Sequence, residues 1–88
     1  MNKKEKILDQ YPENEFTFLP DEFDHAIVGV IESFGSELKI CYDKDEVIGQ
    51  YVHEGMSYDE AIEFFEYNTI GAYVGETTPV FMTIYFQS

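Results

Sequence analysis

The chain has 88 residues, of which 18 are Asp or Glu and five are Lys, with no Arg, so its formal net charge is −13 at pH 7. This length allows one domain, and the excess of carboxylates excludes nucleic-acid binding through the phosphate backbone. No run of roughly 18 apolar residues occurs, so we expect no membrane partner. The single cysteine, Cys41, excludes an internal disulfide and fits a reducing cytoplasm.

An N-terminal arm is predicted over residues 1–20, ahead of a single α+β domain over 21–86. Residues 3–10 are mostly polar and favour one or two turns of a frayed helix. An aromatic stretch over 16–19 then ends at Pro20. Because the residue before a proline is pushed towards extended geometry, we expect this arm to be partly extended and partly frayed.

An antiparallel β-hairpin is predicted over residues 26–31 and 38–42. Its first strand is apolar on both faces, which is typical of a strand covered on both sides. Gly29 in its middle indicates a bulge or a close backbone approach. A turn over 33–36 joins the strands, and the alternating run 80–84 could add a third strand.

Two consecutive helices are predicted near 44–54 and 58–70, packed on the hairpin. Asp43 and Ser57 are each followed three residues later by Glu, the pattern of a capping box. Gly55 is a natural left-handed stop between the helices. The buried stripe of the second helix is expected to contain Tyr58, Ala61, Ile62 and Phe65. The predicted fold class is therefore α+β.

No catalytic, metal or cofactor site is predicted, and we do not expect an enzyme. Nucleophilic catalysis requires a nucleophile, a base and an orienting group, whereas Cys41, His25 and His53 lie at unrelated places. Residues 43–54 have the length of a calcium loop, but Ile48 stands where its sharp turn needs glycine. A group that could surround a divalent ion, but is more simply a solvated loop, comprises Asp21, Glu22, Asp24 and His25.

A protein-binding surface is expected on the second predicted helix and on the segment that follows it. From residue 45 onwards the chain has eight acids and neither Lys nor Arg, and tyrosine and asparagine make adaptable contacts in binding surfaces. The predicted interface residues are Asp59, Glu63, Glu66, Tyr67, Asn68 and Tyr73. An alternative interpretation is that Asn68 and nearby glycines shape a helix terminus while the two tyrosines pack internally.

Four segments carry a resemblance to a known family. They are 24–30 (DHAIVGV), 55–68 (GMSYDEAIEFFEYN), 71–76 (GAYVGE) and 78–81 (TPVF). Together they resemble a family of small uncharacterised acidic proteins of bacteriophages and prophages, over roughly residues 21 to 82. The resemblance implies a phage or prophage origin and action in the cytoplasm of a bacterial host cell. It implies no catalytic residues.

The sequence predicts a small acidic phage-type binding protein that docks on a host protein with a basic surface, defence proteins included, and inhibits or modulates it. One alternative is a nucleic-acid mimic whose carboxylates copy phosphates and block a DNA-binding protein. Another is a self-associating structural module, for example a homodimer. A mimic needs acids aligned on one long face, whereas many acids here flank caps and turns, so docking is preferred.

Overall fold

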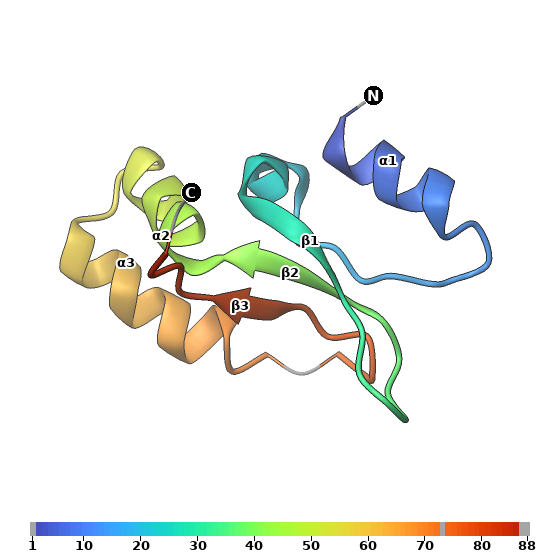
Figure 1. Ribbon diagram of the computed structural model, residues 1–88. Coiled ribbons are helices and arrows are strands. Elements are labelled where there is room, and N and C mark those ends of the chain that lie inside the picture. Colours follow the sequence, from blue (N-terminus) through green and yellow to red (C-terminus); the bar gives the residue numbers. More distant parts are fainter. Residues whose placement is uncertain (1, 73, 87–88) are drawn as a thin grey trace.

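The computed structural model describes residues 2–72 and 74–86 as one layer of sheet with helices packed against it (Figure 1). In chain order the elements are α1 (Lys3–Gln10), the 3₁₀ helix η1 (Asp21–Ala26), β1 (Ile27–Ile31), β2 (Lys39–Asp43), α2 (Lys44–His53), α3 (Tyr58–Phe64), the π-helix η2 (Phe65–Thr69) and β3 (Val80–Met82). The predicted α+β class, with a hairpin and two consecutive helices, is confirmed. None of the described helices is long and apolar enough to cross a bilayer.

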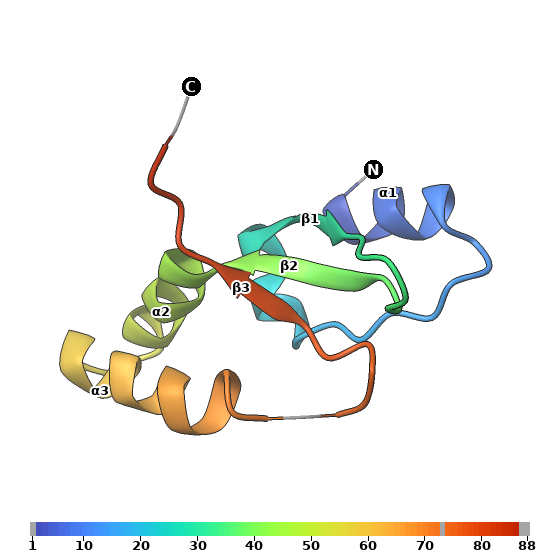
Figure 2. The ribbon, with the colours of Figure 1, turned by 60° about the horizontal axis from the view of Figure 1, so that its bottom comes forward.

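The sheet has the order β1-β2-β3 and is mixed. Strands β1 and β2 pair antiparallel, and their register shifts between Ile27 and Gly29, so the predicted bulge is confirmed. Strand β3 pairs with β2 in parallel, with Val80 beside Cys41. A parallel neighbour requires a crossover connection, and here α2, α3 and η2 supply it before the chain returns to the sheet (Figure 2).

The expectation that the first strand is covered on both sides is wrong. Val28 is 47% exposed and Ile31 is 37% exposed, and the strand begins at Ile27 because η1 takes up Ala26. The bulge explains this pattern, because an extra residue shifts the two-residue alternation by one. Ile27 before the bulge and Val30 after it therefore pack on the core.

Strand β2 is the one buried on both faces. Ile40, Cys41 and Tyr42 are all at most 2% exposed. Burial, followed by the nearby Asp43 carboxylate, raises the pKa of the Cys41 thiol and keeps it protonated. Cys41 is therefore a buried small hydrophobic residue of the central strand.

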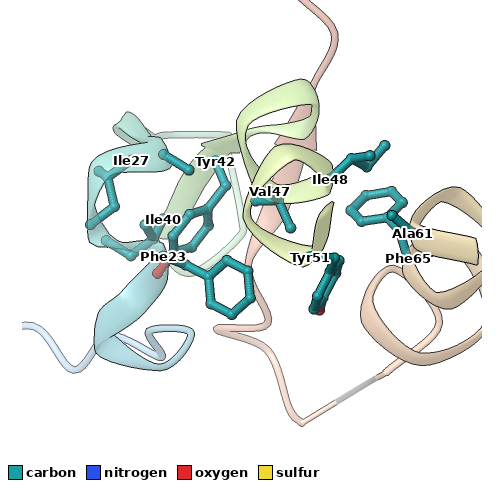
Figure 3. Close-up of a cluster of buried hydrophobic side chains, with 10 residues drawn as sticks. Phe23, Ile27, Ile40, Tyr42, Val47, Ile48, Tyr51, Ala61 and Phe65 are labelled. Carbon is teal, nitrogen blue, oxygen red and sulfur yellow. The ribbon is translucent and has the colours of Figure 1, made fainter. Parts of the chain in front are cut away.

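The core lies where the helices meet the sheet (Figure 3). Its members are Phe23, Ala26, Ile27, Ile40, Tyr42, Val47, Ile48, Tyr51, Ala61 and Phe65. Ala61 of α3 and Phe65 at the start of η2 occupy the predicted buried stripe, and Ile62 packs partly against the core. Tyr58 is 63% exposed, so its predicted burial is wrong. It is the first residue of α3, where the helix has not yet reached the core.

The predicted helix starts and the stop between them are confirmed. The Asp43 carboxylate accepts hydrogen bonds from the first-turn N–H groups of α2, at 3.0 and 3.4 Å. Ser57 and Glu60 form a complete capping box at α3, with N···O distances of 3.2 and 3.0 Å. Gly55 adopts φ = 115°, a backbone conformation that only glycine adopts without strain. These local signals position α3 and the surface described below.

The segment predicted as an N-terminal arm lies against the rest of the chain. Helix α1 makes two full turns, and the Asn2 side chain caps it. Lys4 Nζ lies 2.7 Å from the Asp21 carboxylate and 3.3 Å from that of Asp24, which ties α1 to η1. Phe16, Phe18 and Leu19 pack against the core cluster.

Lowering the pH should weaken the attachment of α1 to η1, because protonation of Asp21 breaks its ion pair with Lys4. The hydrogen bond from Lys4 lowers the pKa of Asp21 below its ordinary value of 3.8. A lowered carboxyl pKa stabilises the folded state above the unfolded value, and that contribution disappears as pH falls through the folded value. We therefore expect the amide chemical shifts of Ile7 and Leu8 to change as pH falls below 3.8.

A Lys4→Met variant provides the control for this titration. Without the Lys4 ammonium, the Asp21 carboxylate has no ion pair that acid could break. Helix α1 should therefore be less firmly attached already at neutral pH, and its amide shifts should show no separate change as pH falls below 3.8. A Lys39→Met variant removes a lysine outside α1 and should keep the step. The same acid step in the Lys4→Met variant would contradict the assignment.

Candidate functional site

The candidate site is the outer surface of α3 and η2, named here the α3 surface and formed by Asp59, Glu60, Glu63, Phe64, Glu66, Tyr67 and Asn68. Phe65 is fully buried, whereas Tyr67, two residues later, is 78% exposed. A step of two residues turns the side chain by roughly 160–200° in a π- or α-helix, so burial of one aromatic directs the other to solvent. The alternative interpretation, in which Tyr67 packs internally, is therefore wrong.

Contacts behind the surface hold η2 in place. The Ile70 N–H donates to the Phe65 carbonyl at 2.8 Å, the i→i+5 bond of a π-helix. The Tyr51 hydroxyl and the Thr69 hydroxyl lie 2.6 Å apart, and the Tyr51 ring packs edge-on against Phe64 with centroids 4.9 Å apart. Single π-turns occur often at functional positions in helices. The Tyr51 contacts fix both ends of the segment that carries Tyr67.

In the part of the chain that the structure describes, no ion pair is formed by the carboxylates of the α3 surface. Asp59, Glu60, Glu63 and Glu66 are all exposed. Among the described residues, ion pairs join Lys4 to Asp21 and Asp24, and the His25 imidazole lies 3.7 Å from the Glu46 carboxylate. None of these contacts involves a carboxylate from residue 54 onwards. The hydrogen bond from the Ser57 N–H lowers the pKa of Glu60. The surface therefore carries a local negative field at neutral pH.

A shallow depression of about 340 Å³ lies within this surface. It is lined by Met56, Glu60, Glu63, Phe64, Tyr67 and Asn68. The structure thus brings together Glu63, Tyr67 and Asn68 of the predicted interface. Asp59 and Glu66 lie on the same helical segment outside the lining, and Tyr73 lies outside the described residues.

Three lining residues were missed by the sequence reasoning. Glu60 was assigned only a capping role, which it has, but its side chain also borders the depression. Phe64 is not among the predicted interface residues, yet its side chain is 38% exposed. Met56 lies in the loop between α2 and α3, and its position depends on how the two helices meet. One sequence signal could have indicated that Phe64 is exposed: it directly precedes Phe65, a core aromatic residue, in the same helical segment.

The other candidate positions are occupied by structural contacts. Lys4 lies between Asp21 and Asp24, where the sequence allowed a divalent ion. Lys44–His53 form helix α2 and not the open loop that a calcium site of this length requires. Within residues 2–72 and 74–86, no group of three or more His, Cys, Asp or Glu is arranged to hold a metal ion.

Comparisons with known proteins add no relative: no family model, no curated protein and no solved structure matches the chain. The candidate site therefore rests on the geometry and charge of the α3 surface.

Proposed function

We propose that this chain is a small acidic binding protein of bacteriophage type, not an enzyme. In this proposal the α3 surface docks on a basic surface of a host protein and inhibits or modulates that protein. The supporting observation is the exposed Tyr67, which stands beside a depression bordered by Glu60 and Glu63, with no ion pair for these carboxylates among the described residues.

The charges and the aromatic ring have different roles in this proposal. Unpaired exposed carboxylates attract a cationic surface and accelerate the encounter, an effect that decreases with salt because the screening length is about 8 Å at physiological ionic strength. Affinity comes mainly from a few anchors, for which tyrosine is among the most effective residues. Tyr67 is the candidate anchor, since most of its ring is free in the isolated chain.

The depression indicates what the partner contributes. A lysine or arginine side chain could enter between the Glu60 and Glu63 carboxylates and contact the faces of Phe64 and Tyr67. A cation over an aromatic face gains about 0.5–2 kcal/mol, and the carboxylates add charge-assisted hydrogen bonds. A basic protein surface is therefore the proposed partner.

The phage origin and the bacterial cytoplasm are proposed on the resemblance of residues 21 to 82 to small phage proteins. Small phage proteins of this class often act by binding to a host protein. This generalisation concerns the class and does not follow from the fold. Affinity capture from bacterial lysate, followed by mass spectrometry, would supply the partner for the measurements below.

We expect two changes on the α3 surface to weaken binding to the captured partner by about tenfold or more, the scale of losing one anchor or two charge contacts. They are Tyr67→Ala and the pair Glu63→Lys with Glu66→Lys. The matched control is Glu13→Lys with Glu15→Lys, which makes the same charge change at two exposed positions ahead of the core. Titration calorimetry at low and high salt measures both effects.

The outcome separates docking from its alternatives. A loss below about threefold in both α3 variants would show that the surface is placed wrongly. If the control pair weakens binding as strongly as the α3 pair, net charge and not this surface controls the interaction. Displacement of the protein from a DNA-binding partner by duplex DNA would favour a nucleic-acid mimic instead.

A further inference from the structure

A second surface feature has the opposite charge character. A groove of about 330 Å³ runs between α1 and β1, with a floor formed by Ile27, Val28, Gly29 and Val30. Lys3, Lys6 and Tyr11 are among the residues that α1 and its C-terminal end contribute to the wall. No carboxylate lines this groove, although the chain contains 18 Asp and Glu residues. Figures 1 and 2 place α1 and α3 at opposite ends of the molecule.

The floor of the groove is an unpaired strand edge. Strand β1 is the first strand of the sheet and has only β2 as a neighbour. Lys3 Nζ donates to the carbonyls of His25 and Ile27 at 2.7 and 2.9 Å, which protects the start of this edge. Lysine is a common guard of edge strands, because an unprotected edge recruits further strands.

Beyond Ile27 the edge is accessible. Val28 is 47% exposed, and no atom lies within 4 Å of the place where a side chain on Gly29 would begin. The sheet face over Gly29 is therefore open, and a partner chain can lie close to β1 beside the exposed side chain of Val28.

We infer that this groove binds an extended peptide segment of a partner protein, in which an aliphatic residue and an acidic residue are separated by one position. The segment adds to β1 as a strand, and its main-chain groups pair with the free edge. Residues two apart in a strand point to the same side, so the aliphatic side chain and the carboxylate of the segment share one face. The aliphatic side chain packs beside the exposed side chain of Val28, and the carboxylate pairs with Lys6.

Lys6 is the side chain that selects the acidic residue. It is exposed at the groove, and within the described residues its ammonium forms no hydrogen bond or ion pair. Lys3, by contrast, is already engaged with two carbonyls. The net charge of −13 repels a strongly acidic peptide, so a segment with one carboxylate at this position fits better than an acidic run.

A peptide titration followed by amide chemical shifts tests the inference on the full chain. The probe is a capped pentapeptide of the pattern Thr-Val-Thr-Glu-Thr, and the comparison peptide has Lys in place of Glu. We expect the shift changes to centre on Val28, Gly29, Val30 and Lys6. The Glu peptide should bind about fivefold to tenfold tighter than the Lys peptide, the scale of reversing one partly exposed charge contact.

Two controls assign the contacts. Lys6→Glu should weaken the Glu peptide by about fivefold or more, whereas Lys39→Glu, at a lysine outside the groove, should leave it unchanged. A peptide methylated on its central main-chain nitrogen lacks a donor for the strand edge and should lose most of its binding. This second control leaves the protein unchanged, so it does not depend on the folding of a variant.

Several outcomes would overturn the inference. They are the absence of shift changes along β1, equal binding of the methylated peptide, and indifference to Lys6→Glu. Shift changes along β1 that grow with protein concentration alone would show that a second copy occupies the edge instead. Glu63→Lys with Glu66→Lys should leave peptide binding unchanged, so this result is independent of the α3 surface.

Discussion

Replacing Phe65 by alanine should lower the free energy of unfolding by about 3–5 kcal/mol, the usual loss for a core phenylalanine. The Phe65 side chain is fully buried, and its ring packs edge-on against Phe81 with centroids 5.0 Å apart. Lys44 Nζ lies over the same ring, 5.6 Å from its centroid. A domain this small has a total stability near the lower end of the usual range, about 5 kcal/mol, so this one change should leave the protein close to unfolded.

Phe64 provides a matched control one position earlier in the chain. It is 38% exposed and packs mainly on Tyr51, so Phe64→Ala should cost less than about 2 kcal/mol. Urea unfolding followed by far-ultraviolet circular dichroism measures both variants. Similar losses in the two variants would contradict the assignment of Phe65 to the core and Phe64 to the surface.

Tyr42→Phe should lower the free energy of unfolding by about 1–3 kcal/mol, the cost of leaving a partly buried donor without its acceptor. The Tyr42 ring is fully buried, and its hydroxyl oxygen accepts a hydrogen bond from the Leu19 N–H at 2.8 Å. This bond fixes residues 16–19 to β2. Removing it should also accelerate hydrogen exchange at Leu19 more than at amides of the central strand.

Tyr11→Phe is the control for the lost hydroxyl. Tyr11 packs edge-on against Phe16 at 5.9 Å between centroids, and among the described residues its hydroxyl makes no hydrogen bond. The free energy of unfolding of the Tyr11→Phe variant should stay within about 0.5 kcal/mol of that of the parent chain, as for most surface changes. If Tyr42→Phe also stays within that range, the segment before η1 is not held by this bond.

Local chemistry determined the helices and the hairpin, and these were predictable from the sequence. Asp43, Ser57 and Gly55 set where α2 and α3 start and where the chain turns between them. Each of these signals acts over a few residues, through one side chain and the nearest backbone groups, so a linear pattern contains it. The bulge at Gly29 belongs to the same class.

The candidate site was predictable in its charges but not in its shape. The exposed side of one helical segment carries Asp59, Glu63, Glu66 and Tyr67. Their exposure follows from the sequence pattern, because apolar residues such as Phe65 occupy the opposite side of the segment. The depression also needs Met56 and Phe64, whose exposure depends on how α3 packs against α2. Packing between elements is not periodic in sequence, so no pattern signals it.

Tertiary contacts alone decided the remaining features. The sequence could indicate a third strand but not its parallel pairing with β2, because direction depends on the crossover through α2 and α3. Nor could it place Lys3 on the carbonyls of His25 and Ile27, which lie 22 and 24 residues away along the chain. Contacts at such separations form only once the core has fixed the elements in space, and the groove beside β1 depends on them.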